Sequence, residues 1–162
     1  MPHRDARWKL IVLFVAIGVA ACHSRVSPPA GDVAASLTLP TLTGATFDPS
    51  LLHGKPAIVT FWRPGCPYCA NALPKDLRAA RDTGASAVAI TIAGGPTRAA
   101  EELDKLRWSG FALVADQKTL DRYGIPHVPY SFVLRPDGTA ARVIDGDELD
   151  EDDIAAALRD AR

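Results

Sequence analysis

The stretch PAIVTFWRPGCPYCA, residues 56–70, joins an apolar run to a closely spaced pair of cysteines. Its first part, Pro56–Trp62, is continuously apolar and β-rich, which predicts a buried central strand. A short turn follows, and the chain then has helical character as far as Arg81. Pro67 suits the first position of that helix, because no N–H group is needed there. Cys66 is therefore expected at the N-cap of a helix that begins directly after a core strand.

The cysteine pair fits a metal site or a structural disulfide poorly. Structural zinc takes four ligands, commonly two cysteine pairs or one pair with two spaced histidines. Here there is one pair, and the nearest histidines, His53 and His127, are isolated. A structural bridge over about four residues is geometrically tight and removes little entropy from the unfolded chain. We therefore disfavour both roles.

A reactive pair has a physical mechanism at this junction. The sulfur of an N-cap cysteine faces the free N–H groups of the first helical turn, and these donors and the helix dipole stabilise a thiolate. Cys66 is therefore predicted to be the attacking thiol, with a pKa below that of a free cysteine. Cys69 lies one turn further on and is expected to be more buried. Its predicted role is to resolve the mixed disulfide that Cys66 forms.

The rest of the globular sequence alternates strands and helices. A short hairpin around Gly44 is predicted before the central strand, and a second hairpin is predicted to turn at Pro136–Gly138. Two further strands are predicted at Ala85–Gly94 and Phe111–Asp116. Three further helices are predicted at Thr97–Trp108, Lys118–Tyr123 and Asp150–Ala161. This alternation indicates an α/β sandwich.

The N-terminus has the pattern of an export signal. Arg4, Arg7 and Lys9 precede the apolar run Leu10–Ala21, which is shorter than the roughly 20 residues that a membrane-spanning helix needs. The run ends in Val19–Cys22 (VAAC), which resembles the lipobox of bacterial lipoproteins, in which the cysteine is lipidated. An uncleaved signal anchor and an ordinary signal peptide are the alternatives. All three place the domain outside the cytoplasm, where disulfides persist.

The sequence is accordingly divided into three segments. Residues 1–21 are predicted to be the signal peptide, residues 22–36 the lipidated Cys22 and a flexible tether, and residues 37–162 the folded domain. The tether is polar, contains prolines and a glycine, and shows no strand or helix period. The net charge of −1, with both signs interspersed, gives no basic stripe for nucleic acid.

Four landmarks follow one another along the chain. Trp62 stands four residues before Cys66, and Pro74 follows that cysteine by eight residues. Tyr123–Pro129 reads YGIPHVP, and Pro129–Gly138 reads PYSFVLRPDG. From about residue 37 onward, the chain thereby resembles the thioredoxin superfamily, most closely the exported TlpA/ResA-like thiol–disulfide oxidoreductases. The resemblance implies a central mixed β-sheet flanked by helices, with an extra N-terminal β-hairpin.

The resemblance also implies roles for the residues around the pair. Pro129 is expected to be a cis-proline that faces the disulfide, presents the Val128 backbone to a substrate and keeps metals from the thiols. From the residues alone, Pro126 is an alternative cis-proline. No cofactor and no bound metal are expected. The residues expected to contact the substrate are Trp62, Pro67, Tyr68 and Val128.

The chain departs from the family pattern where a proton acceptor is expected. Thioredoxins carry a buried acid six residues before the first cysteine, where this chain has Thr60. TlpA-like proteins often carry glutamate two residues before the kink proline, where this chain has Ala72. No obvious carboxylate replaces either one. The remaining candidates for the base that deprotonates Cys69 are therefore water and a residue distant in sequence.

The predicted function is thiol–disulfide exchange in the bacterial cell envelope. The Cys66–Cys69 dithiol is expected to reduce the disulfide-bonded cysteines of exported proteins in the periplasm. An unidentified electron-donor protein is expected to supply the electrons, and lipidated Cys22 is expected to hold the domain at a membrane. The alternatives are a DsbA-like oxidant and a copper-binding chaperone that uses both sulfurs and His127, although an exposed loop residue is the simpler interpretation of that histidine. A thiol peroxidase is disfavoured, because Arg63 stands where the peroxidase motif requires threonine.

Overall fold

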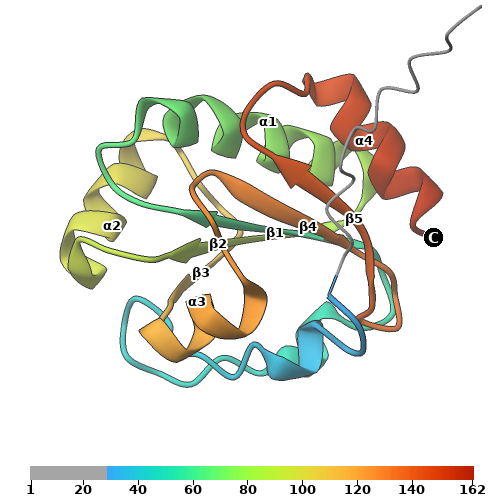
Figure 1. Ribbon diagram of the computed structural model, residues 1–162. Coiled ribbons are helices and arrows are strands. Elements are labelled where there is room, and N and C mark those ends of the chain that lie inside the picture. The colour runs from blue at the N-terminus through green and yellow to red at the C-terminus, as the bar shows by residue number, and fades with distance from the viewer. Residues whose placement is uncertain (1–28) are drawn as a thin grey trace, which may run out of the picture.

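The computed structural model describes residues 29–162, so the predicted signal peptide, Cys22 and the first part of the predicted tether lie outside the described residues. A five-stranded mixed sheet forms the middle layer, with strand order β3-β2-β1-β4-β5 (Figure 1). The strands are β1 (Ala57–Trp62), β2 (Ser86–Thr91), β3 (Phe111–Val114), β4 (Tyr130–Leu134) and β5 (Ala140–Asp145). The helices are α1 (Pro67–Thr83), α2 (Gly95–Lys105), α3 (Gln117–Tyr123) and α4 (Glu151–Asp160), with short 3-10 turns η1 (Ala34–Ser36) and η2 (Pro49–Leu52). This architecture confirms the predicted thioredoxin-like α/β fold.

Strand β1 occupies the centre of the sheet. It pairs in parallel with β2 and antiparallel with β4, and all six of its residues are buried. A strand covered on both faces needs apolar side chains throughout, which is why its sequence does not alternate. In the antiparallel pair, Phe61 lies opposite Tyr130. The turn that leaves β1 and the loop that enters β4 therefore meet at the same edge of the sheet.

Two layers cover the sheet (Figure 1). Helices α1 and α4 pack on one face, where Ile58 of β1 joins a cluster with Leu77 and Leu158. On the other face, Phe61 packs with Tyr123 of α3 and with the segment that precedes β1. The alternation of the β1 side chains between the two clusters follows from the period of a strand.

The folded domain begins earlier than predicted. Asp32 forms a bridge with Thr139, and the side chains of Val33 and Ala34 are 3% and 0% exposed. The hydroxyl of Tyr123 donates a hydrogen bond to the carbonyl of Val33 at 3.3 Å. The assignment of residues 32–36 to a flexible tether is therefore wrong. The segment has too few apolar side chains to show the period of a strand or a helix, yet these side chains fill the core at this end.

The predicted hairpin around Gly44 is less regular than a pair of strands. Its arms are joined by one antiparallel bridge, between Pro40 and Thr46. The amide of Val114 donates to the carbonyl of Pro40 at 2.8 Å, so this segment lies along the outer edge of β3. Proline has no N–H to donate, which restricts the segment to such an edge position.

The later elements follow the prediction closely. The second hairpin joins β4 and β5 through the predicted turn at Pro136–Gly138. Asp116, the last residue of the predicted strand Phe111–Asp116, is the N-cap of α3 and accepts a hydrogen bond from the amide of Thr119 at 2.8 Å. Across residues 29–162, none of the helices combines the length and the hydropathy of a bilayer span.

Candidate active site

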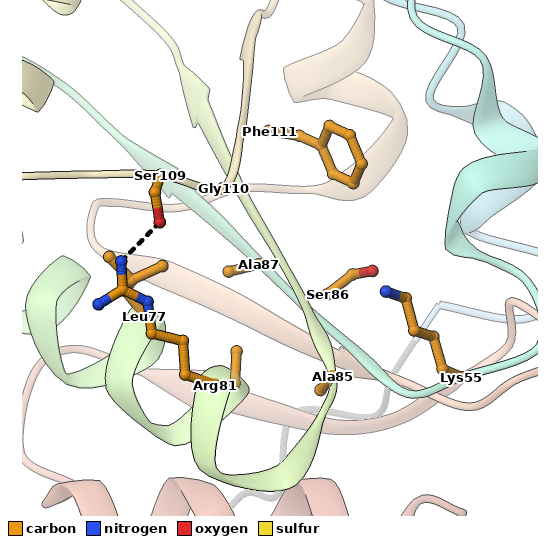
Figure 2. Close-up of a pocket in the computed structure, with 10 residues that line it drawn as sticks. Lys55, Leu77, Arg81, Ala85, Ser86, Ala87, Ser109, Gly110 and Phe111 are labelled. Atoms are coloured by element: carbon orange, nitrogen blue, oxygen red, sulfur yellow. Dashed lines mark hydrogen bonds between the residues drawn. The ribbon is translucent and has the colours of Figure 1, made fainter.

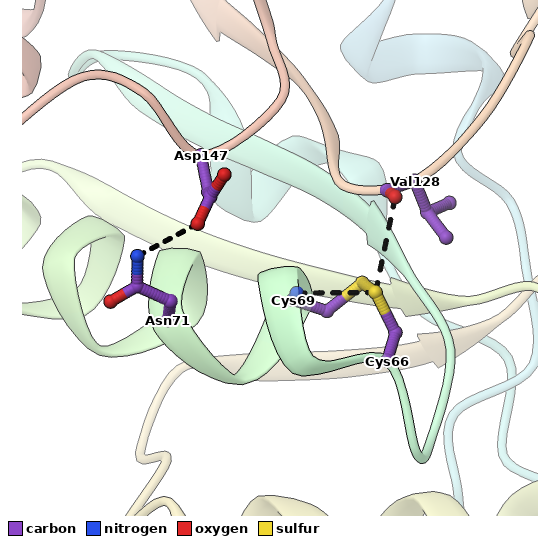
Figure 3. Close-up of a disulfide and its surroundings, with 5 residues drawn as sticks. All are labelled: Cys66, Cys69, Asn71, Val128 and Asp147. Carbon is purple, nitrogen blue, oxygen red and sulfur yellow. Dashed lines mark hydrogen bonds between the residues drawn. A yellow bond between two sulfur atoms is a disulfide. The ribbon is translucent and has the colours of Figure 1, made fainter.

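Cys66 is the N-cap of α1, as predicted. Its sulfur accepts a hydrogen bond from the amide of Cys69 at 3.2 Å, and Pro67 occupies the first helical position. Gly65 has a φ of +76°, a left-handed conformation that lets the chain turn from β1 into α1 without a side-chain clash. The two sulfurs are joined in a disulfide whose Cα atoms are 5.2 Å apart (Figure 3). The strand-to-helix junction therefore presents a closed Cys66–Cys69 pair at a helix N-terminus.

The loop before β4 faces this disulfide. The carbonyl oxygen of Val128 lies 3.9 Å from the sulfur of Cys66, although the two residues are 62 positions apart (Figure 3). The Val128–Pro129 peptide bond is cis, the isomer that the resemblance implied for Pro129 rather than for Pro126. The pairing of β1 with β4 brings these two segments together.

The predicted substrate contacts divide into exposed and buried residues. Tyr68 is 63% exposed, and Pro67 beside it is also exposed. Trp62 was expected to contact the substrate, but it is only 1% exposed and packs in a cluster with Cys66 and Cys69. The prediction that Trp62 contacts the substrate is therefore wrong. Its side chain lies beneath the cysteine pair, because a side chain at the end of this central strand points into the layer under α1.

The two cysteines differ little in exposure while they are joined. Cys66 is 4% exposed and Cys69 is 1% exposed, so the second cysteine is the more buried one, as predicted. Both residues belong to one buried cluster with Leu73 of α1 and Leu103 of α2. The reactive sulfur is thus reached from the side of the Val128 loop rather than through the core.

His127 does not complete a metal site with the two sulfurs. Its ring is 53% exposed and pairs with the carboxylate of Asp145, and it also stacks edge-on against Tyr130 with ring centroids 6.0 Å apart. Within the described part of the chain, no cluster of three or more His, Cys, Asp or Glu residues is arranged to hold a metal ion. The simpler interpretation of this histidine, an exposed loop residue, fits the structure.

Asp76 is a buried carboxyl that was not predicted. It is 2% exposed in the middle of α1, and it accepts a hydrogen bond from the hydroxyl of Thr60 at 2.7 Å. That hydroxyl in turn accepts one from Ser131 at 3.0 Å. Burial raises the pKa of Asp76 to about 7, against the opposing effects of the Thr60 hydrogen bond and the Lys75 charge. The available signal was its helical spacing from Cys69, which places both residues on the apolar face of α1.

Two surface cavities lie away from the disulfide. One, of about 250 Å³, is lined by residues that include Lys55, Arg81 and Phe111 (Figure 2). The other, of about 300 Å³, lies between the segment before β1 and α3. Neither is lined by the cysteines or by the loop before β4. Neither cavity therefore belongs to the disulfide site.

Comparisons with known proteins agree with this geometry. A family model described as the AhpC/TSA family matches residues 30–143. The soluble secreted antigen MPT53 of Mycobacterium tuberculosis is 33% identical over 141 residues, which are 82% of this chain and 79% of that protein. The thiol-disulfide oxidoreductase ResA of Bacillus subtilis is 26% identical over 146 residues, which are 85% of this chain and 81% of that protein.

A solved structure extends the likeness to three dimensions. The crystal structure of a secreted Mycobacterium tuberculosis disulfide oxidoreductase, described as homologous to E. coli DsbE, matches with a TM-score of 0.70 and 28% identity. The match covers 80% of this chain and 99% of that chain. It therefore includes almost the whole of the solved domain.

The N-cap geometry predicts unequal reactivity of the two thiols. In the reduced protein at mildly acidic pH, iodoacetamide should alkylate Cys66 well before Cys69, because helix N–H donors stabilise the Cys66 thiolate. Mass spectrometry of the two modified sites over time gives the ratio of rates. Equal labelling, or faster labelling of Cys69, would reverse the assignment of the attacking thiol.

The buried carboxyl predicts a pH-dependent stability. Between the ordinary pKa of 3.8 and the folded value of about 7, the folded protein holds a proton on Asp76 that the unfolded chain has released. The free energy of unfolding should therefore fall as pH rises through this window. Asp76→Asn should remove this loss, which is on the order of 4 kcal/mol by linkage.

Urea unfolding of the oxidised protein at several pH values measures this effect. The stability of Asp76→Asn relative to the unmodified protein should increase from about pH 4 to about pH 7. Asp82→Asn is the matched control, because Asp82 lies on the same helix but is exposed. Parallel pH profiles for the unmodified protein and Asp76→Asn would show that the folded protein does not retain this proton.

Proposed function

The chain belongs to the AhpC/TSA family of the thioredoxin superfamily and is a thioredoxin-like thiol–disulfide oxidoreductase, and on that premise we propose that its Cys66–Cys69 pair reduces disulfides in exported proteins. The observation that carries this proposal is the place of Cys66. Its sulfur stands at the N-cap of α1 and 3.9 Å from the Val128 carbonyl. One backbone segment stabilises the thiolate, and the other offers a hydrogen-bonding edge to an incoming chain.

The exchange proceeds in two displacement steps. The Cys66 thiolate attacks one sulfur of a client disulfide, and the other client sulfur leaves as a thiolate that takes up a proton. Cys69, once deprotonated, attacks the Cys66 sulfur and releases the remaining client sulfur. The client gains two electrons and two protons, and the pair becomes the disulfide seen in the structure. A donor protein must then supply two electrons to reopen it.

The surface around Cys66 suits an extended polypeptide. The Val128 carbonyl can accept a hydrogen bond from a client amide, as a strand edge does in peptide recognition. Tyr68, 63% exposed beside Cys66, offers an aromatic surface to the client's side chains. Because both contacts are generic, they favour a class of clients that share an accessible disulfide over one particular sequence.

The alternatives differ in observable ways. An oxidant of the DsbA type has the same disulfide geometry, and the reduction potential distinguishes it from a reductant. A copper carrier would need His127 to turn from Asp145 toward the sulfurs. A thiol peroxidase would need a threonine where Arg63 stands.

The proposed location is the bacterial cell envelope. A curated relative and a solved structure are each described as secreted, and the N-terminal sequence of this chain ends its apolar run in Val19–Cys22. We infer that Cys22 is lipidated, that the domain is held at a membrane on the periplasmic side and that its clients are exported proteins. Disulfides can form and persist in that compartment.

A reductase assay tests the proposed activity. The reduced protein should catalyse dithiothreitol-driven reduction of insulin, and Cys66→Ala should abolish catalysis because the attacking sulfur is lost. His127→Ala should change the rate only modestly, since this ring faces Asp145 rather than the sulfurs. The potential of the pair, measured against glutathione, should lie on the reducing side of that couple.

Two results would contradict this reading in different ways. A potential well above that of glutathione would make the protein an oxidant. Tight stoichiometric Cu(I) binding that is lost in His127→Ala, without any reductase activity, would make it a copper carrier.

Lipid labelling tests the proposed anchor. In the native host, the protein should partition into detergent and carry acyl mass on Cys22, and Cys22→Ser should stop the labelling. Recovery of a soluble, unacylated mature chain would exclude the lipid anchor and leave the redox proposal untouched.

A further inference from the structure

Arg98 of α2 lies beside the turn that precedes Cys66. A Cβ atom at Gly65 would stand 3.4 Å from Nη2 of Arg98, so the guanidinium group covers the residue directly before the cysteine. Because neighbouring Cα atoms are about 3.8 Å apart, Nη2 lies within about 9 Å of the Cys66 Cα atom. The Arg98 side chain is exposed. The exchange steps described above make no use of this charge.

The path of the Arg98 side chain is set by its neighbours. A Cβ atom at Gly94, the N-cap of α2, would lie 3.7 Å from Cδ of Arg98 and 3.2 Å from Cγ of the buried Pro64. The stem of Arg98 therefore passes Gly94 and Pro64 before its charged end reaches the turn. The next residue, Ala99, is buried in the cluster that contains Cys66. The start of α2 is thus fixed beside the cysteine pair.

The Arg98 charge is not explained by an ion pair or by its helix. Within residues 29–162, Arg98 forms no salt bridge. Glu101 and Glu102 follow it at helical spacing, but neither comes within salt-bridge distance. Arg98 stands at the end of the first turn of α2, where the helix dipole disfavours a cation. The guanidinium group is therefore available to a binding partner.

Opposite charges lie on opposite sides of Cys66. The cysteine follows β1, the middle strand of the sheet, and α2 packs on the neighbouring β2. Arg98 therefore lies on the β2 side, and the exposed Arg63 stands on the turn itself. Asp145 and Asp147 lie at the end of β5 and just after it, and both already contact other side chains. A client carboxylate is thus attracted to the β2 side and repelled from the β5 side.

We propose that Arg98 is a client-recognition residue that favours disulfides flanked by acidic side chains. The inference rests on the proposed exchange function and names a class of client for it. An extended client chain over Cys66 advances about 3.3 Å per residue, so its residues two and three positions from the reacting cysteine lie about 7 to 10 Å away. A carboxylate at that distance meets the guanidinium fork of Arg98, which suits a bidentate pair.

The exposed position of Arg98 favours action on the client over action on the thiolate. Exposed charges are screened over about 8 Å at physiological ionic strength. The Cys66 sulfur already has a closer donor, the amide of Cys69 at 3.2 Å. A client side chain can approach Arg98 directly, so it gains the larger share of the interaction. The experiment below separates the two effects.

Two activated peptides measure the preference. The full chain carries Cys22→Ser and Cys69→Ser, so that Cys66 is its only thiol. Each peptide has one cysteine joined through a disulfide to 2-thiopyridine, and the glutamates two and three residues from this cysteine in one peptide are glutamines in the other. The Cys66 thiolate attacks the peptide sulfur. The pyridine sulfur leaves with the electron pair of the broken bond, and the product takes up a proton to become the absorbing pyridine-2-thione.

The quantity to compare is the rate constant for the glutamate peptide divided by that for the glutamine peptide. At low salt this ratio should be about three to five for the parent chain. Arg98→Gln should lower the ratio to about one, Arg98→Glu should lower it below one, and Arg98→Lys should keep most of it. Salt at about 0.5 M should reduce the parent ratio, because it screens exposed charges.

Lys105→Gln is the matched control. It removes the same charge from an exposed position on α2, two turns and about 10 Å further along the helix. This variant should keep the parent ratio. A ratio that falls equally in Lys105→Gln and Arg98→Gln would show a general effect of net charge and overturn the role of Arg98.

The remaining outcomes separate the recognition role from the exchange function. A parent ratio near one, or a ratio that Arg98→Gln leaves unchanged, would overturn recognition by Arg98 and leave exchange standing. Equal slowing of both peptides in Arg98→Gln would also overturn it, because the charge would then act on the Cys66 thiolate. A parent chain that releases no thione from either peptide would instead refute exchange through Cys66.

Discussion

Backbone pairing of β1 on both edges is the constraint from which the site follows. A strand buried on both faces must satisfy its N–H and C=O groups within the sheet, and β1 does so with β2 and β4. Its end is consequently fixed, and the turn at Gly65 starts α1 at a defined place. The antiparallel register with β4 then sets the Val128 loop opposite the helix N-terminus. The two halves of the site are thus positioned by hydrogen bonds of the core.

The chemistry around Cys66 is supplied largely by the backbone. The amide of Cys69 donates to the sulfur, and the carbonyl of Val128 lies on the other side. An amide and a carbonyl keep their polarity whatever side chains they carry, so the site depends on geometry more than on residue type. The nearby side chains adjust access: Tyr68 extends into solvent, while Trp62 closes the space below.

The interior polar network belongs to the same architecture. Thr60 on β1 and Ser131 on β4 are direct cross-strand partners, and their hydroxyls lead to the carboxyl group of Asp76 on α1. A carboxylate in such a place is costly, whereas a protonated carboxyl is tolerated. The fold therefore holds a group that changes charge near neutral pH within the helix that carries both cysteines.

The sequence by itself determined the features that depend on neighbouring residues: the buried strand before Cys66, the N-cap, the helix after it and the late hairpin. Apolar runs, helix-start chemistry and turn residues are local signals, so they survive without knowledge of contacts. Only the tertiary structure decided which side chains are covered by distant segments. Val33 and Ala34 joined the core because Tyr123 and Thr139 meet their segment there, and His127 faces Asp145 because β5 lies beside its loop. Asp76 is a buried acid because the hydroxyls of Thr60 and Ser131 lie on two paired strands that α1 covers. Helical spacing can place Asp76 on the apolar face of α1, but it cannot show which groups on the sheet lie opposite that face.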